Sequence, residues 1–398
     1  MYRLLFLRGS SDEKLFLHSL STISFTVPEL NVLQVNKFYH PVVGGIEHVV
    51  TQVAEGLVEE GHHSAVLASV KRGFGEAYTH KGVAVQKSGS LGVALSTPIA
   101  PMFPSHLWRQ ARDRDILHYH LPNPVGVISH LLVRPDVPTA VTYHSDIVKQ
   151  SNVLPAYRPF LELFLESVDR IITTSPQLRD HSEVLSQFRE KVSVVPLAID
   201  PDQIESDPPA KPQIAIPEHG QVLLFVGRLN YYKGVEYLLR AFSQVSAEAT
   251  LLLIGDGERR DDIEELAVAL DLGESVRFLG RVPDDVLNYC YHVADVFVLP
   301  SVEPSEAFGI VQLEAMAQGT PVVNTNLNSG VPWVSQGGQT GLTVPPRDSD
   351  ALADAIESLL ENADLRKRYG SNAITRVREK FTEDRMLEGI LTEYHSLV

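Results

Sequence analysis

The stretch DVFVLPSVEPSEAFGIVQLEAMAQGTPVV, residues 295–323, reads as a strand, a loop, a helix and the start of a second strand. The apolar, β-branched run at 295–300 indicates a buried strand, and 310–317 has the composition of a nearly apolar helix. Gly319 supplies a helix stop, and Pro321 prevents continuation. A buried strand followed by a helix and another buried strand is typical of a parallel sheet with helices on both faces.

The same unit recurs on both sides of this stretch. Apolar runs at 31–35, 64–69, 116–121, 139–144, 170–175 and 191–197 alternate with helical stretches such as 45–61 and 159–169. A segment rich in proline and charge, 200–219, reads as a linker. The pattern then restarts at 221–227 and continues through 249–255, 275–280 and 340–346, and from about Asp348 the chain is mostly helical.

We therefore predict an α/β protein with two Rossmann-like, doubly wound parallel-sheet domains that face a cleft, and a helical C-terminal tail. The expected domains are 31–205 and 206–380, and the helix at 381–398 is expected to pack back towards the first domain. Residues 1–30 are treated as an N-terminal extension of uncertain role, either without function or forming a small element packed on the fold. Ligands of such sheets bind beyond the carboxyl ends of the strands.

Composition excludes several classes of protein. The net charge of −16 argues against a nucleic-acid partner, although a local basic patch remains compatible with contact to an anionic membrane surface. Cys290 is the only cysteine, so an internal disulfide is impossible, and a reducing cytoplasm fits best. No apolar run approaches the length of a membrane span, and the opening residues have too short an apolar stretch, and no small-residue cleavage signal, to predict secretion.

Cations and glycines follow two of the expected strands. Arg228 and Lys233 lie in RLNYYKG, directly after the strand at 221–226 and before a helix, an arrangement that suits a diphosphate. Taken alone, the pair also fits two solvated surface cations. Gly44 and Gly45 begin a helix after the first strand and permit close backbone approach to a ligand, although a plain turn explains them equally well.

Three histidines lie in two of the expected strands. His144 ends the strand TAVTYH, where an imidazole can bind a substrate hydroxyl or orient a reacting group, while a loop histidine without a role is the alternative. His118 and His120 fall on one face of ILHYHL, so a metal pair is conceivable. No third ligand is apparent, and we expect no metal site.

Two acids stand out in the opening stretch. At 100° per residue, Glu314 lies about 40° from Ile310 and so shares a face with apolar neighbours. Burial of its carboxylate requires a partner, either ligand hydroxyls or a basic side chain inside the fold. Glu306 precedes the helix, which we expect to begin near Gly309, and the N–H groups of Phe308, Gly309 and Ile310 are positioned to meet an anion. The two acids together fit one elongated, hydroxyl-rich ligand.

These residues resemble the motifs of the retaining GT-B glycosyltransferases of glycosyltransferase family 4. The resemblance covers about residues 31–395 and is carried by GRLNYYKG, FLGRV and SEAFGIVQLEAMAQGTPVV, which matches the family's E-x7-E motif. It implies an acceptor-side first domain, 31–205, and a second domain, 206–380, that binds a nucleotide-diphosphate sugar.

The resemblance also implies a role for each site residue. Arg228 and Lys233 match the pair that holds the donor diphosphate, and Glu314 matches the acid that binds the ribose. Glu306 and His144 match residues near the transferred sugar and the reaction centre. The remaining donor-site positions match backbone contacts to sugar, phosphate or base: Gly44, Gly45, Arg281, Val282, Phe308, Gly309 and Ile310.

The implied reaction retains the anomeric configuration through front-face displacement, with cations and amides in place of a metal. DRD at 113–115 and DSD at 348–350 do not resemble a metal-binding D-x-D after a strand, so we expect no cofactor. GVPWVSQGGQTGLTVPP resembles bacterial mannosyl- and rhamnosyltransferases of surface polysaccharide assembly. GDP-mannose is therefore the expected donor, with a UDP-sugar as alternative, and the acceptor is a glycan or lipid-linked glycan.

Three other classes remain as alternatives at this stage. A GT-B nucleotide-sugar epimerase shares the same site but transfers nothing to an acceptor. A dehydrogenase needs a dinucleotide fingerprint after its first strand, whereas IGDGERRDD, residues 254–262, lacks the third glycine and lies in the second domain. A binding protein that has lost catalysis has no reason to keep both acids and both cations of the motif. The expected location is the cytoplasm, at or near the inner face of the cytoplasmic membrane, and the oligomeric state is not predicted.

Overall fold

The computed structural model describes residues 28–42, 44–147, 154–205, 212 and 220–398. Residues 1–27 of the expected extension and most of the expected linker therefore lie outside the described residues. Leu30 is buried, and its backbone N–H donates to Nδ1 of His62 at 3.2 Å, so the residues directly before the first strand are part of the first domain.

The first sheet has eight strands within the described residues, in the order β10-β9-β8-β7-β1-β2-β4-β3. Every pair is parallel except β3–β4, which is antiparallel. The strands are β1 (Asn31–Val35), β2 (His63–Ser69), β3 (Glu76–His80), β4 (Val83–Ser88), β7 (Ile116–Leu121), β8 (Thr139–Tyr143), β9 (Arg170–Thr173) and β10 (Val192–Val194). The helices of this half are α2 (Gly45–Glu59), α3 (Phe103–Gln110), α4 (Pro124–Val133), α5 (Leu154–Ser167) and α6 (Pro176–His181).

The second sheet has six strands, all parallel, in the order β13-β12-β11-β14-β15-β16 within the described chain. Its strands are β11 (Gln221–Val226), β12 (Ala249–Ile254), β13 (Val276–Gly280), β14 (Val296–Leu299), β15 (Val322–Thr325) and β16 (Gly341–Val344). The helices are α8 (Val235–Phe242), α9 (Arg260–Ala269), α10 (Asp284–Val293), α11 (Val311–Ala317), α12 (Val331–Val334) and α13 (Ser349–Glu361), with a 3₁₀ turn, η4 (Tyr231–Lys233). The prediction of two doubly wound domains is confirmed.

Three segments differ from the sequence-based expectation. The region expected to be linker from residue 200 begins with a helix, α7 (Pro201–Glu205), which contacts α11. An antiparallel edge strand, β3, and a small hairpin of β5 (Val93–Ala94) and β6 (Thr97–Pro98) follow β2, and neither was expected. The motif helix begins at Val311 rather than near Gly309, because Gly309 adopts a φ of +73° that a helix cannot contain.

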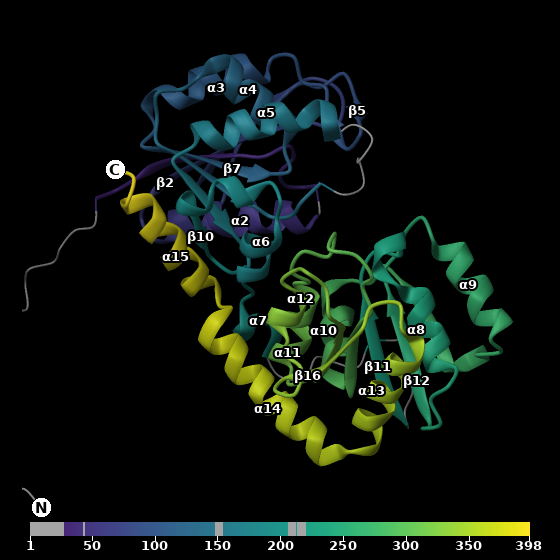
Figure 1. The fold of residues 1–398 in the computed structure, drawn as a ribbon. Coiled ribbons are helices and arrows are strands. Elements are labelled where there is room, and N and C mark those ends of the chain that lie inside the picture. The colour runs from purple at the N-terminus through teal and green to yellow at the C-terminus, as the bar shows by residue number, and fades with distance from the viewer. Residues whose placement is uncertain (1–27, 43, 148–153, 206–211, 213–219) are drawn as a thin grey trace, which may run out of the picture.

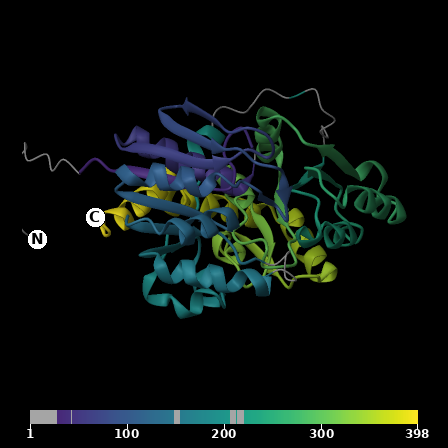
Figure 2. The same cartoon turned by 90° about the horizontal axis from the view of Figure 1, so that it is seen from above.

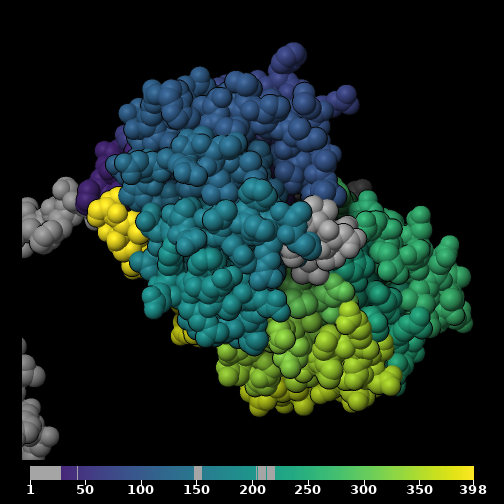
Figure 3. Space-filling model, turned by 45° about the horizontal axis from the view of Figure 1, so that its top comes forward, coloured from purple at the N-terminus to yellow at the C-terminus, as the bar shows by residue number. Residues whose placement is uncertain are grey.

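Two C-terminal helices connect the domains. α14 (Ala363–Lys380) contacts α11 in the second domain, and α15 (Glu383–His395) contacts α2 in the first. Figure 1 shows this yellow segment running from the lower half to the upper half of the molecule, and in Figure 2, seen from above, it runs across the molecule to the end marked C. In Figure 3 the last residues emerge beside the purple start of the first domain. The two segments that pass between the domains lie side by side. The N–H of Ile199, in the first of them, donates to the carbonyl of Phe381, in the second, at 3.0 Å.

Candidate active site

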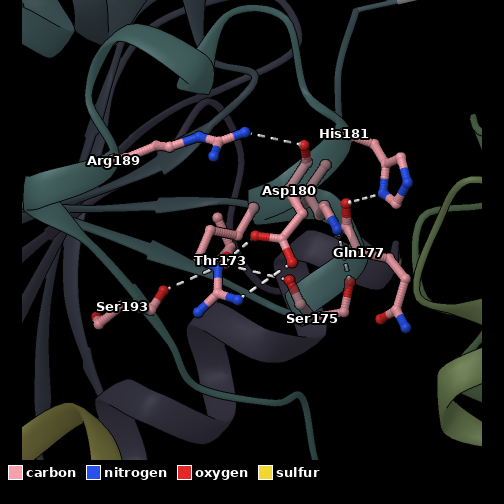
Figure 4. A network of polar contacts seen from close by, with 9 residues as sticks. Thr173, Ser175, Gln177, Asp180, His181, Arg189 and Ser193 are labelled. Carbon is pink, nitrogen blue, oxygen red and sulfur yellow. Dashed lines mark hydrogen bonds and ion pairs between the residues drawn. The ribbon is translucent and has the colours of Figure 1, made fainter.

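The carboxyl ends of the two sheets meet at Ser175 and Gly330. Ser175 follows β9 and caps α6, its Oγ accepting from the N–H of Leu178 at 3.2 Å. Figure 4 shows this region, including Thr173, whose hydroxyl donates to the carbonyl of Ser193. A Cβ added to Gly330, which follows β15, would lie 3.0 Å from Oγ of Ser175. The loops that follow the strands of one sheet therefore touch those of the other.

Lys233 and Glu306 form a buried ion pair in the second domain. Nζ of Lys233 lies 2.6 Å from Oε2 of Glu306, and both side chains are buried. The hydroxyl of Ser301 donates to the same oxygen at 3.1 Å. Lys233 follows β11 and Glu306 follows β14, and these strands are neighbours. The sheet thus brings two predicted site residues together, although 73 positions separate them in the sequence, and Lys233 already has a carboxylate partner inside the protein.

The loop before α11 presents backbone N–H groups. Within the described residues, the N–H groups of Phe308, Gly309 and Ile310 have no hydrogen-bond acceptor. The left-handed φ of Gly309 turns the backbone there, and a Cβ would lie 2.7 Å from Leu299 and 2.8 Å from Gln312, so a larger residue is strained as well as crowded. Phe308 packs its ring against Trp333 and Phe381, which fixes the loop from beneath. Three N–H groups held in one loop suit an anion or ligand hydroxyls.

A second cation approaches from the first domain. Lys37 follows β1, and burial lowers the pKa of its ammonium group, which the carboxylate of Glu47 raises in part and the charge of Arg228 lowers again. Arg228 is exposed and follows β11 of the other sheet. Two positive charges from opposite domains therefore lie within electrostatic range of each other. An anion bound between them would offset their mutual repulsion.

Glu314 hydrogen-bonds a phenol rather than a cation. The hydroxyl of Tyr291, in α10, donates to Oε2 of Glu314 at 2.5 Å. No basic side chain among the described residues pairs with Glu314, so the alternative of an internal ion pair is wrong. Burial raises the pKa of Glu314, and the hydrogen bond from Tyr291 opposes that shift. A carboxylate with one satisfied oxygen retains acceptor capacity for a ligand.

Gly44 and Gly45 lie where expected, at the start of α2. Gly44 is the N-cap residue in extended conformation, which any residue adopts. A Cβ at Gly44 would lie 2.1 Å from Oε2 of Glu47, so the buried Glu47 carboxylate lies directly against this glycine. Space around Gly45 is open. A larger residue at position 44 would displace the Glu47 carboxylate, and the sequence analysis did not single out Glu47.

His144 is a buried, neutral imidazole directly after β8. Its backbone N–H donates to the carbonyl of Leu121 at 3.1 Å, and its Nε2 lies 3.1 Å from Nδ1 of His120. Burial, together with the nearby charge of Lys37, lowers the pKa of His144 to about 3. A histidine kept neutral at physiological pH acts as a hydrogen-bonding group and not as a cation.

Arg281 and Val282 lie apart from the other predicted residues. They follow β13, the edge strand of the second sheet, with Arg281 exposed and Val282 packed against core residues. Because β12 separates β13 from β11, these residues lie at the outer end of the same row of loops as Arg228. That position is compatible with the far end of an elongated ligand.

His118 and His120, considered above as a metal pair, are buried in the core of the first domain. Both ring nitrogens of His118 and both of His120 are hydrogen-bonded to protein groups, and both side chains are buried. Within the described part of the chain, no group of three or more His, Cys, Asp or Glu side chains is arranged to hold a metal ion. The alternation of a strand explains why the two rings share a face.

Two sizeable surface hollows lie away from these residues. One of about 820 Å³ is lined by α4, α5 and the end of α15, including His130 and Ser396. The other, of about 900 Å³, lies on the first domain between Arg72, Phe74, Leu91 and Met102. Neither is lined by a residue that the sequence motifs predicted to bind the donor.

Comparison with known proteins decides the family. Residues 43–203 match the model described as Glycosyltransferase Family 4, and residues 206–376 match that of Glycosyl transferases group 1. The chain is 32% identical to O-antigen chain mannosyltransferase C of Escherichia coli, over 93% of this chain and 99% of that protein. The chain belongs to the family 4 glycosyltransferases. It is also 34% identical to D-rhamnosyltransferase WbpZ of Pseudomonas aeruginosa, over 89% of this chain and 92% of that protein.

Solved structures show the same fold for this glycosyltransferase. Sucrose-phosphate synthase from Thermosynechococcus elongatus superposes with a TM-score of 0.77 at 23% identity, over 93% of this chain and 99% of that one. HepE of Anabaena, solved in complex with UDP, superposes with a TM-score of 0.72 at 19% identity, over 92% and 100% of the two chains. The GT-B fold predicted from the motifs is confirmed. Among the described helices, none is both long and apolar enough to cross a membrane.

Proposed function

We propose that this glycosyltransferase moves a hexose, with retention of configuration and without a metal, from a nucleotide-diphosphate sugar to a glycan or lipid-linked glycan of a surface polysaccharide. One observation carries the proposal. Cations from both domains, Lys37 after β1 and Arg228 after β11, lie within electrostatic range of each other, each at the carboxyl end of its sheet. The second domain adds Lys233 and the acceptor-free N–H groups of residues 308–310. Together these groups suit a diphosphate whose negative charge grows as it leaves.

The proposed step is a front-face displacement. The bond between the anomeric carbon and the diphosphate oxygen breaks, and its electron pair stays on the diphosphate. The acceptor oxygen bonds the anomeric carbon on the same face, and its proton moves to the departing diphosphate. Retaining hydrolases instead use a carboxylate nucleophile about 5 Å from a second carboxyl group. We do not assign that role to Glu306, because the ion pair with Lys233 and the hydrogen bond from Ser301 stabilise its carboxylate and so make it a weaker nucleophile.

Roles for the remaining residues follow from their surroundings. Glu314 has acceptor capacity for ribose hydroxyls, with Tyr291 binding one carboxylate oxygen. Glu306 has a second oxygen for a sugar hydroxyl, and neutral His144 offers a further hydrogen-bonding group near Lys37. Arg281 and Val282 are the proposed contacts to the base. The backbone at Gly44 and Gly45 is the part of the first domain that we propose to contact the diphosphate.

GDP-mannose is the proposed donor, supported by the mannosyltransferase and rhamnosyltransferase relatives. A UDP-sugar is the second candidate, favoured by the fold's similarity to Anabaena HepE, a protein solved in complex with UDP-glucose. A thermal-shift screen with GDP, UDP, ADP and their sugars separates these donors, because a ligand that binds only the native state raises its melting temperature. We expect the largest rise with GDP-mannose; no rise with any sugar nucleotide contradicts the proposal.

Transfer itself is tested with radiolabelled donor and a polyprenol-linked glycan extracted from cells. The proposal predicts label in the lipid-linked fraction. Conversion of the donor into a different free sugar nucleotide, without transfer, would identify an epimerase instead.

The first domain has a surface suited to a lipid-linked acceptor at the cytoplasmic face of the membrane. Phe74 and Leu91 are 99% and 72% exposed and line one hollow with Met102 and Arg72. Residues 71–114 contain seven Lys and Arg against two Asp and Glu, although the whole chain carries a net charge of −16. Exposed apolar side chains among basic ones favour binding to an anionic lipid surface.

A further inference from the structure

A line of buried polar side chains runs from His144 into the first sheet. Nε2 of His144 lies 3.1 Å from Nδ1 of His120, and Nε2 of His120 lies 2.8 Å from Oε1 of Gln34. All three side chains are buried, and they come from the neighbouring strands β1 and β7 and from the residue after β8. The rings of His120 and His144 are nearly parallel, 5.4 Å apart. The carboxyl end of the sheet thus connects the proposed sugar site to its interior.

The line continues to the C-terminal helix. Nε2 of Gln34 donates to the hydroxyl of Tyr394, in α15, at 3.1 Å, across 360 positions of sequence. That hydroxyl lies 2.6 Å from Nδ1 of His118, whose Nε2 lies 2.8 Å from Oγ1 of Thr142. Tyr394 is fully buried, so the helix that returns from the second domain completes the core beneath the site.

The donor and acceptor capacities of these groups assign a direction to the hydrogen bonds in the line. Oε1 of Gln34 only accepts, so Nε2 of His120 carries a proton and donates. A neutral imidazole has a single N–H, so Nδ1 of His120 accepts, and Nε2 of His144 must be the donor to it. Beyond Gln34, the amide donates to the hydroxyl of Tyr394, and in the same direction the Tyr394 proton is donated to Nδ1 of His118. Nε2 of His118 then donates to Thr142, and each step uses a donor and an acceptor in turn.

The histidines satisfy the requirement of neutrality. Ring centroids of His118 and His120 are 4.4 Å apart, so charging either ring places a cation beside two other buried imidazoles. Burial lowers the pKa of His118 to about 3, and it lowers that of His120 well below its ordinary value. For neutral rings, the orientation of the Gln34 amide sets the tautomers of His120 and His144, since turning the amide around would move both ring protons to the other nitrogen.

We propose that His120 and Gln34 are positioning residues that hold His144 as the Nε2–H tautomer, so that Nδ1 of His144 accepts a hydrogen bond from a hydroxyl of the donor sugar. This inference rests on the proposed function, because the sugar is the ligand of that nitrogen. A hydroxyl group can also accept from an imidazole N–H, so the fixed tautomer decides which hydroxyl geometry the site prefers.

The first test reads the tautomer directly and needs no ligand. Long-range ¹H–¹⁵N spectra of protein labelled with ¹⁵N-histidine distinguish Nε2–H from Nδ1–H, and single His→Phe variants assign the signals. We expect His118, His120 and His144 all to be neutral Nε2–H tautomers at pH 7. An Nδ1–H tautomer or a cation at His144 overturns the inference, whatever the protein transfers.

The second test measures how much the sugar contributes to the affinity for the sugar nucleotide. His120→Phe removes the acceptor for His144, and His120→Asn restores an oxygen that accepts. His130→Phe is the matched control, because His130 is also buried and hydrogen-bonded on both sides, to Tyr119 and Ser167, but has no contact with the line. Calorimetry compares GDP with GDP-mannose and UDP with UDP-glucose for each variant.

For His120→Phe we expect the sugar nucleotide to bind roughly three- to tenfold more weakly, as loss of one neutral hydrogen bond implies, with unchanged affinity for the nucleoside diphosphate. His120→Asn should recover most of this loss, and His130→Phe should match the parent protein. Equal losses in His120→Phe and His130→Phe, or an unchanged ratio in His120→Phe, overturn the inference. If no nucleotide binds the parent protein, the proposed function fails, while the tautomer measurement still decides the positioning role.

Discussion

Lys233 and Glu306 form an ion pair, 2.6 Å from Nζ to Oε2, that joins the loop after β11 to the loop after β14. Both side chains are buried, so the pair is poorly screened by solvent. In the proposed mechanism, Lys233 therefore contacts the bound diphosphate while it remains paired with Glu306. Arg228, Lys37 and the N–H groups of the loop at 308–310 then supply the positive charge that the pair does not.

Lys233→Ala should reduce turnover at least tenfold, because a charge-assisted contact to the diphosphate is worth roughly 1.5–3 kcal/mol. The substitution also leaves Glu306 buried without its cation, which should destabilise the fold by about 3–5 kcal/mol. Steady-state kinetics and thermal unfolding of Lys233→Ala, Glu306→Gln and the double variant separate the two effects. Adding Glu306→Gln should recover stability but not turnover; recovery of both would make the role of Lys233 structural only.

Glu314→Ala should weaken nucleotide binding without unfolding the protein, since it removes the proposed ribose acceptor. Tyr291→Phe is the matched variant, because it removes the hydrogen bond to Glu314 while leaving the carboxylate in place. We expect calorimetry to show a larger loss of affinity for Glu314→Ala than for Tyr291→Phe. Intact nucleotide binding in Glu314→Ala would exclude the ribose role.

The pH dependence of stability should change when Glu314 becomes Gln. Burial raises the pKa of Glu314 above its ordinary value of 4.5, so the folded protein holds this proton more tightly than the unfolded chain. The carboxyl group therefore lowers the free energy of unfolding increasingly as pH rises from about 4.5 through the raised folded pKa. Relative to the parent, Glu314→Gln should gain stability as pH rises from about 4.5 through the raised folded pKa of Glu314. A melting-temperature difference that stays constant over this range would contradict the raised pKa.

Transfer should continue after removal of divalent cations. In the proposed mechanism Arg228, Lys37, Lys233 and the N–H groups at 308–310 stabilise the leaving diphosphate, which is the work that a metal performs in other transferases. The measurement is transfer of labelled sugar after dialysis against EDTA, followed by addition of Mg²⁺ or Mn²⁺. Activity that is abolished by the chelator and restored by Mg²⁺ would refute a metal-independent reaction.

Binding to anionic vesicles should depend on the apolar residues of the first domain. Replacing Phe74, Leu91 and Met102 by Ser removes the exposed apolar side chains of one hollow. We expect sedimentation with phosphatidylglycerol vesicles to fall at least fivefold, since burial of apolar surface contributes roughly 25 cal/mol per Å². Val268→Ser is the control, because Val268 is 80% exposed but lies in α9 of the second domain. Equal binding by the triple variant and the parent would remove this surface as the membrane contact.

The local sequence predicted most of the secondary structure but missed some short elements and one helix boundary. The alternation of apolar strands and helices predicted both sheets, because the hydrophobic period is a local property of the chain. The antiparallel strand β3 and the hairpin β5–β6 were not predicted, since a short edge strand with exposed residues has little hydrophobic pattern. The start of α11 was two residues off because Gly309 has a left-handed φ of +73°, and the composition of the stretch does not reveal a backbone angle.

The sequence by itself determined that two doubly wound domains carry the E-x7-E motif and its basic partners, because strand period and motif spacing are written along the chain. It identified Glu314 as an acid that needs a partner, but only the tertiary structure supplied Tyr291. The same holds for the pair of Lys233 with Glu306, for Lys37 beside Arg228, and for the line from His144 through Gln34 to Tyr394. These contacts join residues that are distant in sequence, and hydrogen bonds and charges act over a few ångströms, so only the folded arrangement of strands and helices decides which groups meet.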